Sequence, residues 1–201
     1  APLANNVAYA CAVEKLMGIQ VSERADYIRV IMSELTRVQN HLIFIGMFLN
    51  DLGAMYTPAL YAFEERELIL DIFEAVSGAR MMCNYMRFGG CRCDLPDGWL
   101  TQAQTVVAEF PRFIDEFENF LTGNEILMSR TQGIGRMSRE LAINAGITGP
   151  LLRAAGVDYD VRVADPYSSY EEFDFVIPVG TNGDTYDRFT VRQEEMRQSL
   201  S

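Results

Sequence analysis

The sequence contains no uninterrupted apolar run of the length that a membrane span requires, which is about 20 residues. Its most apolar stretch, Leu42 to Leu49, is interrupted by Gly46 and bounded by His41 and Asn50. The first residues, Ala1-Pro2-Leu3, also lack the basic segment and apolar run of a secretion signal. The sequence therefore predicts a chain that does not itself cross a membrane.

Basic residues are scarce, because 17 Lys and Arg stand against 28 Asp and Glu, giving a formal net charge of −11. Such a charge disfavours direct binding to nucleic acid or to an anionic membrane surface. The hydrophobic share of 49% in 201 residues is ample for a packed core. We expect one domain or two small ones.

Histidine is nearly absent, since His41 is the single one, and cysteine is limited to four. A lone His inside a helix is more often a hydrogen-bonded structural group than a catalytic base, and no nucleophile-elbow motif accompanies it. We expect Cys11, Cys83, Cys91 and Cys93 to be free thiols in a reducing compartment. The Cys91-x-Cys93 spacing is a weak metal pattern, so no resident metal ion is predicted.

The first two thirds of the chain do carry a strong helical period of apolar residues. A long helix is predicted after Ser22, which is a suitable N-cap. Its apolar positions step by three and four, at Ile28, Ile31, Leu35, Val38, Leu42, Ile45 and Leu49. From Leu42 onward apolar side chains surround the helix axis, so we expect the C-terminal half of this helix to be buried on all sides.

Two further helices are predicted before residue 124. The second follows Pro58 and runs towards Arg87, where Gly89-Gly90 stops it. The third carries apolar residues from Val106 to Phe120, and Pro111 predicts a kink or a restart within it.

Glycines divide the chain after Gly123 into short elements. We expect a short helix between Pro150 and Gly156, a strand from Glu172 to Val179, where apolar and polar residues alternate, and a last helix through Val191 to Leu200.

These patterns define a mainly α fold class. The prediction is a helical bundle core over residues 1–124, followed over residues 125–201 by a small mixed α+β region that is continuous with the same domain.

A carboxylate, Asp51, ends the most apolar segment of the chain. Ile43, Met47 and Asp51 are spaced by four, so they share a face if the helix continues that far. An apolar wall ending in an acid suits a lipophilic ligand with a polar head group. The alternative is that Asp51 caps the helix end or pairs with an arginine, and the residues alone favour that alternative.

Several motifs occur in an order and at spacings that resemble one protein family. They are Asn50-Asp51-Leu52-Gly53-Ala54-Met55, Phe63-Glu64-Glu65-Arg66-Glu67, Ser77-Gly78-Ala79-Arg80-Met81, Asp94-Leu95-Pro96, Gly149-Pro150-Leu151-Leu152-Arg153 and Glu194-Glu195-Met196-Arg197-Gln198-Ser199-Leu200. The family is the quinone-site, or 49 kDa, subunit of respiratory complex I, which is related to the large subunits of nickel–iron hydrogenases. The resemblance implies a mostly helical core similar to the hydrogenase large subunit.

The resemblance also implies a quinone site. It favours a role of Asp51 at that site over the helix-capping or ion-pair role that the residues alone favour. Asp51 would take the catalytic role of an aspartate that holds a histidine, which engages the quinone together with a tyrosine; neither partner lies in this chain. Ile43, Met47 and Leu60 would bind the quinone beside it. Leu60 stands where family members often carry an aromatic residue, so the resemblance does not determine the shape of the cavity.

A second implied site lies near an iron–sulfur cluster. Arg80 and Met82 would lie close to the terminal 4Fe-4S cluster of a neighbouring subunit, and Met82 stands where family members often carry a histidine that couples the cluster to pH. The residues alone favour an internal ion pair of Arg80 with Asp71 or Glu74. Arg153 is expected to contact either a neighbouring subunit or an internal carboxylate.

The implied protein is a peripheral-arm subunit of a proton-translocating NAD(P)H:quinone oxidoreductase. This chain would bind no redox cofactor itself, with quinone as the substrate, the 4Fe-4S cluster in a neighbouring subunit and NAD(P)H used by the whole complex. Its partners would be other peripheral-arm subunits, on the cytoplasmic (or matrix or stromal) side of an energy-transducing membrane. The alternatives are a membrane-associated nickel–iron hydrogenase-like large subunit and a non-catalytic structural subunit.

Full-length members of this family are expected to be about twice as long as this chain. We therefore expect an internal fragment, which in isolation would expose apolar helix surfaces and aggregate or stay molten. A sharp two-state unfolding transition of the isolated chain would contradict that expectation.

Overall fold

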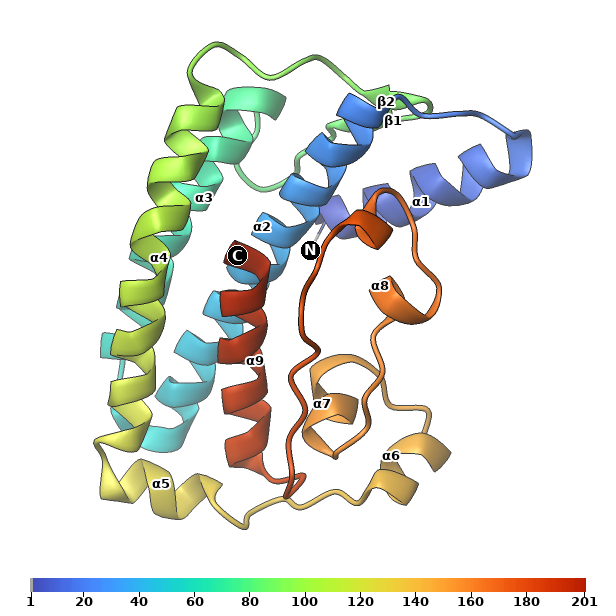
Figure 1. The fold of residues 1–201 in the computed structure, drawn as a ribbon. Coiled ribbons are helices and arrows are strands. Elements are labelled where there is room, and N and C mark those ends of the chain that lie inside the picture. Colours follow the sequence, from blue (N-terminus) through green and yellow to red (C-terminus); the bar gives the residue numbers. More distant parts are fainter. Residues whose placement is uncertain (1) are drawn as a thin grey trace.

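A computed structural model describes residues 2–201, and its architecture is mainly α, as predicted. Figure 1 shows α2 (Glu23–Leu49) running through the middle of the molecule, with α3 (Thr57–Ser77) and α4 (Trp99–Thr122) along one side. The last helix, α9 (Thr185–Leu200), packs on both α2 and α4 and completes the bundle. The remaining helices are α1 (Pro2–Met17), α5 (Glu125–Thr131), α6 (Arg139–Asn144), α7 (Gly149–Ala154) and α8 (Val161–Ala164).

The core forms where the predicted apolar stripes of the long helices meet. On α2, Leu35, Leu42 and Leu49 are almost completely buried, and on α4 the same holds for Phe110 and Phe117. The helix α4 continues through Pro111, so the chain does not restart there. Within residues 2–201, no helix combines the length and hydropathy needed to cross a lipid bilayer.

The C-terminal half of α2 is not buried on all sides, contrary to the expectation from its composition. Phe44 and Met47 are 36% and 45% exposed, whereas Leu42 and Ile45 are fully buried. The reason is that α3 and α9 pack on α2 without enclosing it. One apolar strip of α2 therefore stays at the surface.

The helix α3 ends ten residues earlier than predicted. Gly78 adopts a left-handed conformation (φ 74°) and donates its backbone N–H to the Glu74 carbonyl, which is a standard glycine C-cap. The segment that was expected to be helical instead leads into a two-stranded antiparallel sheet, β1 (Met86–Arg87) and β2 (Gly90–Cys91). Arg80 therefore lies in a bend after α3 and not on the helix.

The first helix, α1, was missed by the sequence analysis. A buried ion pair joins it to α2, because the Arg29 guanidinium binds the Glu14 carboxylate at 2.7 and 2.9 Å. The same guanidinium donates to the Arg87 and Gly90 carbonyls, so one arginine holds α1, α2 and the sheet together.

The strand predicted from Glu172 to Val179 does not form. Glu172 ends a short 3₁₀ turn (Tyr170–Glu172), and residues 173–179 have no regular structure. In the described chain this segment has no neighbouring strand to pair with, and the Val176 N–H donates to the side chain of Gln198 on α9. The alternation arises because Phe175 packs inward under the Arg162 guanidinium, 4.3 Å from the ring centre.

Candidate functional site

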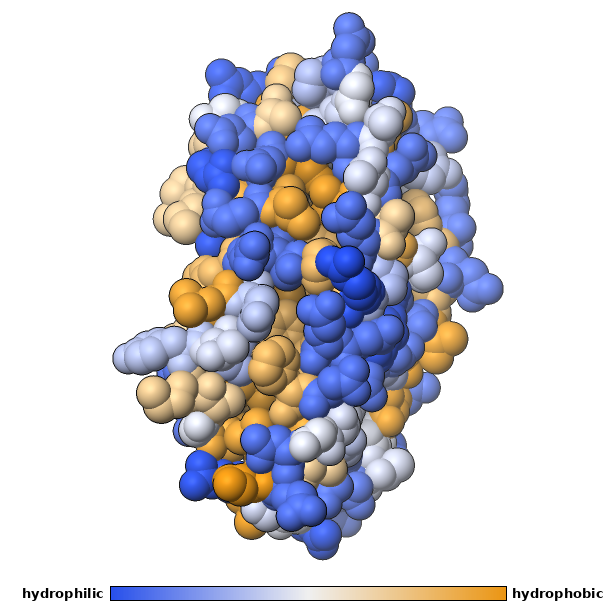
Figure 2. All heavy atoms as spheres, turned by 90° about the vertical axis from the view of Figure 1, so that its left-hand side faces the viewer, coloured by the Kyte–Doolittle hydropathy of each residue, from blue (hydrophilic) through white to orange (hydrophobic). Residues whose placement is uncertain are grey.

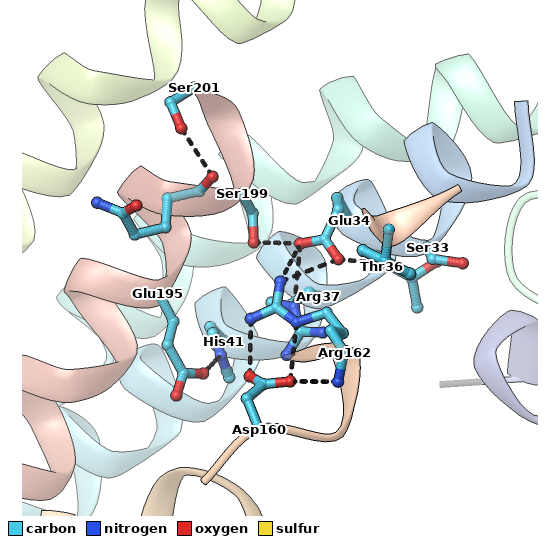
Figure 3. Close-up of polar contacts among 12 residues, drawn as sticks. Ser33, Glu34, Thr36, Arg37, His41, Asp160, Arg162, Glu195, Ser199 and Ser201 are labelled. Atoms are coloured by element: carbon cyan, nitrogen blue, oxygen red, sulfur yellow. Dashed lines mark hydrogen bonds and ion pairs between the residues drawn. The ribbon is translucent and has the colours of Figure 1, made fainter. Parts of the chain in front are cut away.

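A chain of buried and partly buried charges fixes the short C-terminal helices to α2, and we call it the polar network. It consists of Glu34, Arg37, His41, Arg153, Asp160, Arg162 and Glu195, with Tyr170 and Ser199 at its edge. Figure 3 labels Glu34, Arg37, His41, Asp160, Arg162, Glu195 and Ser199. Three of these residues, Glu34, Arg37 and His41, are spaced by three and four along one face of α2. The others come from the loop before α8, from α7, α8 and α9, and from the 3₁₀ turn.

One half of the network centres on Asp160, which caps α8. Its carboxylate accepts hydrogen bonds from the Arg162 side chain at 2.8 and 3.0 Å and from the Arg162 backbone N–H. Burial alone would raise the pKa of Asp160, but these hydrogen bonds and the charges of Arg162 and Arg153 outweigh it and lower the pKa to about 2. Arg162 also binds Glu34 at 3.2 Å, so this half carries ionised groups at neutral pH.

The other half centres on Glu195 of α9. It accepts hydrogen bonds from Arg153 at 2.6 Å and from the Nε2 atom of His41 at 2.7 Å. Burial opposes ionisation of Glu195, yet these two hydrogen bonds lower its pKa to about 2. Burial also lowers the pKa of His41, so its imidazole is neutral at pH 7 and Nε2 donates the proton. His41 is thus the hydrogen-bonded structural group that was predicted, and Arg153 contacts internal carboxylates.

Of the residues predicted to bind quinone, Met47 and Leu60 lie away from this network, where α2 meets α3. Gly46 allows this contact, because a Cβ atom there would lie 2.6 Å from the Ala62 Cβ and 3.1 Å from the Ala59 Cα. Met47 and Leu60 each follow a residue of this contact in the chain, and they are 45% and 67% exposed. We call the contact and its exposed flanks the α2–α3 seam, comprising Ile43, Gly46, Met47, Ala59, Leu60 and Ala62.

Asp51 lies at the end of the seam, in a π-helical turn (Asn50–Ala54) that continues from α2. Its side chain is exposed, so the structure places it at the surface and not inside an apolar pocket. Within the turn, Gly53 leaves the helical conformation, with a φ of 103° that suits glycine. Arg130 of α5 donates to the Leu52 carbonyl and fills the space where a Cβ of Gly53 would lie. Arg130, to which the sequence analysis gave no role, therefore positions this turn.

The residues predicted to lie near an iron–sulfur cluster are at the start of the loop after α3. Arg80 forms ion pairs with Asp71 at 2.6 Å, with Glu74 at 2.8 Å and with Glu67. The internal pair favoured by the residues alone is confirmed. Met82 is 75% exposed on the same loop and also lines a cavity of about 200 Å³ beside α2.

A larger cavity of about 780 Å³ lies between α1, α2 and the C-terminal segment. Ile43 lines it, as do His41 and Phe44, whereas Met47, Asp51 and Leu60 are not among its lining residues. The structure thus brings Ile43 to the cavity and leaves the other predicted quinone residues on the open seam.

Other surfaces and groups add little specific chemistry. Figure 2, which views the side of the molecule carrying α4, shows a broken band of hydrophobic residues between hydrophilic areas. All four cysteines are free thiols. Among residues 2–201, no cluster of three or more His, Cys, Asp and Glu side chains is arranged to hold a metal ion.

Most of the network could not be predicted from the sequence, because its members come from segments up to 165 residues apart. A signal was available in the spacing of Glu34, Arg37 and His41, which puts three polar residues on one face of a helix with an apolar core side.

Comparison with known proteins gives close relatives over nearly the whole chain. It is 56% identical over 197 residues to a D-type NADH-quinone oxidoreductase subunit of Roseiflexus sp. (strain RS-1), covering 98% of this chain and 53% of the relative. It is 54% identical to the D-type NADH-quinone oxidoreductase subunit of Dehalococcoides mccartyi (strain ATCC BAA-2266 / KCTC 15142 / 195), covering 98% and 54%. The corresponding protein of Geotalea uraniireducens (strain Rf4) is also 54% identical, with coverage of 100% and 51%.

The chain therefore spans about half the length of the curated relatives it matches. These relatives are named as quinone oxidoreductase subunits, which favours that assignment over the hydrogenase alternative. The profile of the family described as the respiratory-chain NADH dehydrogenase 49 Kd subunit matches residues 51–201. The chain belongs to this family of 49 kDa NADH dehydrogenase subunits.

Proposed function

We propose that this chain forms part of the quinone site in a peripheral-arm subunit of a complex I-like NAD(P)H:quinone oxidoreductase. The observation that carries the proposal is the α2–α3 seam, where Met47 and Leu60 are exposed beside the Gly46 contact and Asp51 is exposed in the turn that follows α2. An open apolar surface that ends in an acid suits a lipophilic ligand with a polar head group once another part of the assembly covers it.

In this proposal Asp51 does not react with the quinone directly. Its carboxylate holds a histidine from outside these 201 residues, and that histidine engages the quinone head group. Ile43, Met47 and Leu60 contact the apolar part of the quinone. The π-helical turn matters because Arg130 holds it through the Leu52 carbonyl, which sets where the Asp51 side chain projects.

Electrons reach the quinone from a 4Fe-4S cluster in a neighbouring peripheral-arm subunit, and the whole complex takes them from NAD(P)H. Arg80 and Met82 lie towards that cluster, with Arg80 supplying positive charge and Met82 unable to titrate. The chain itself holds no redox cofactor. The assembly sits peripherally on the cytoplasmic (or matrix or stromal) side of an energy-transducing membrane and couples electron transfer to proton translocation.

The test is Asp51→Asn in the full-length subunit within the assembled complex. Removing the charge weakens the hold on the histidine, so we expect a roughly 10²-fold or greater loss of quinone reduction, with NAD(P)H-driven reduction of the cluster preserved. Asp97→Asn changes another exposed aspartate and serves as the matched control, with quinone reduction unchanged. Normal quinone reduction in the Asp51→Asn complex would show that the chain is a structural scaffold.

A further inference from the structure

Five arginines are buried in the part of the chain that the structure describes, and they fall into two groups. Arg29, Arg153 and Arg162 each bind a carboxylate, those of Glu14, Glu195 and Asp160 respectively. Within residues 2–201, Arg66 and Arg192 have no carboxylate within ion-pair distance. A buried guanidinium without an anion is strongly unfavourable, so these two positions call for a partner.

The contacts that Arg66 and Arg192 do make leave most of their donors unused. Arg192 stacks on the Phe44 ring, 3.7 Å from its centre, and donates once, to the Arg188 carbonyl. Arg66 lies 5.8 Å from the centre of the Phe63 ring, and its Nε atom finds no acceptor among the described residues. A guanidinium has five N–H donors, so both side chains can bind further acceptors.

Both arginines line cavities that open on one face of α2. Arg192 lines the cavity of about 780 Å³ and Arg66 the cavity of about 200 Å³. Thr36, Asn40 and Ile43 line both cavities, and their spacing of four and three puts them on a single helix face between the two arginines.

The charge of this face is opposite to that of the protein. No Asp or Glu of the described chain lines either cavity, whereas Arg37, Arg66 and Arg192 do, in a sequence with a net charge of −11. The face therefore offers donors and positive charge to an anionic group.

We propose that this face of α2 is the docking surface for an acidic segment of the same polypeptide from outside these 201 residues, with one carboxylate bound by Arg66 and another by Arg192. The two arginines line separate cavities, with Thr36, Asn40 and Ile43 between them, so each is assigned its own carboxylate. Apolar side chains such as Ile43, Phe44 and Met82 line the same cavities, which suits a polypeptide with mixed apolar and acidic residues. The curated relatives carry about as much polypeptide again beyond the matched part, enough to supply it.

The first experiment identifies the occupant directly. The full-length protein in its assembled complex carries the photoreactive residue p-benzoylphenylalanine in place of Asn40, which is exposed and lines both cavities. After irradiation we expect mass spectrometry to find a crosslink to a peptide of the same polypeptide, outside these 201 residues, that contains Asp or Glu. Thr105, exposed on α4, is the control position. A crosslink to another subunit, to a lipid or to quinone, or no crosslink, would overturn the proposal.

The second experiment tests whether the two arginines hold that segment. Arg66→Gln and Arg192→Gln should each lower the crosslink yield from position 40, by roughly tenfold, and Arg66→Lys should restore part of it. Exposed Arg112→Gln should leave the yield unchanged. Should a Gln variant fail to assemble, the crosslinked Asp or Glu is changed to its amide instead, with the same expected loss. Unchanged yields would refute ion pairing at this face. Quinone reduction does not enter the readout, so failure of this proposal can be told apart from failure of the proposed function, with which it shares Ile43.

Discussion

The polar network and the α2–α3 seam hold α2 on two sides by opposite means. In the network, long charged side chains reach between elements, as where Arg153 and Glu195 meet at 2.6 Å. In the seam, the near absence of side chains lets the backbones approach, because Gly46 faces Ala59 and Ala62. Removing atoms should therefore damage the network, whereas adding atoms should damage the seam.

The difference also shows which region is available for binding. The network lies under α8, α9 and the 3₁₀ turn, and the carboxylates at its centre, Asp160 and Glu195, are 4% and 1% exposed. The seam leaves Met47 and Leu60 at the surface, with Asp51 at its end. The paired carboxylates of Asp160 and Glu195 fix the architecture from inside the protein, while an open apolar surface is left to a ligand or to another part of the assembly.

The largest expected effect comes from removing one charge of the network. Glu195→Gln leaves Arg153 buried beside a neutral side chain and weakens the bond to His41, so the free energy of unfolding should fall by about 3–5 kcal/mol. Pulse proteolysis of the full-length subunit in urea measures this change. Glu194→Gln is the matched control. The Glu194 carboxylate is the next one in the chain and is partly exposed, so this substitution should lower the free energy of unfolding by less than about 1 kcal/mol. Equal losses of unfolding free energy at the two positions would mean that the contribution of Glu195 does not depend on its burial.

The second-largest effect is expected when the pH is lowered, because acid weakens the network. The pKa of Asp160 in the folded chain is lowered to about 2, below the ordinary aspartate value of 3.8, so the unfolded chain takes up this proton first as the pH falls. The stabilisation by Asp160, about 2 kcal/mol, is complete above pH 5 and is lost as the pH falls towards 2. Urea unfolding of the full-length subunit between pH 6 and pH 3 measures it. Asp160→Asn should show a correspondingly weaker dependence on pH.

The seam should respond to added volume. Gly46→Ala puts a methyl group within 2.6 Å of the Ala62 Cβ, which forces α2 and α3 apart and should cost about 1–3 kcal/mol. The same proteolysis measurement applies, and Ala62→Gly in the Gly46→Ala background should recover part of the loss, since it removes the clashing atom. A stabilising effect of Gly46→Ala, as expected from helix propensity alone, would contradict the close contact.

The fold could be predicted where one periodic signal decides the structure. The stripe from Ile28 to Leu49 and the N-cap at Ser22 predicted α2 correctly, since both are local properties of the chain. The end of α3 was placed at Gly89-Gly90 although Gly78 stops it, because the apolar residues between them also suit a helix, whereas only some of them, such as Cys83 and Tyr85, fold inward from a loop. The strand at residues 172–179 failed because alternation cannot show whether a partner strand exists.

The candidate site was predictable only in part for a related reason. Ile43, Met47 and Asp51 are close in sequence, so their placement near one end of α2 followed from helix geometry and from the resemblance. The pairing of His41 with Glu195 joins residues 154 positions apart, and no local pattern specifies it. The same holds for Arg130, which reaches the Asp51 turn from 78 residues away.

The smallest effect is expected at Arg80, whose ion pairs differ from those of the network by being exposed. Its side chain is 37% exposed and those of Glu67, Asp71 and Glu74 are about half exposed, so Arg80→Gln should leave the free energy of unfolding almost unchanged. If Arg80 also lies near the partner's 4Fe-4S cluster, removing its positive charge should lower the reduction potential of that cluster in the assembled complex, because the reduced form loses electrostatic stabilisation. Redox titration of the complex measures this shift, and Arg112→Gln, which removes an exposed arginine of α4, should leave the potential unchanged. A shift in potential without a loss of stability would place Arg80 in function, whereas an unchanged potential would leave it a surface ion pair.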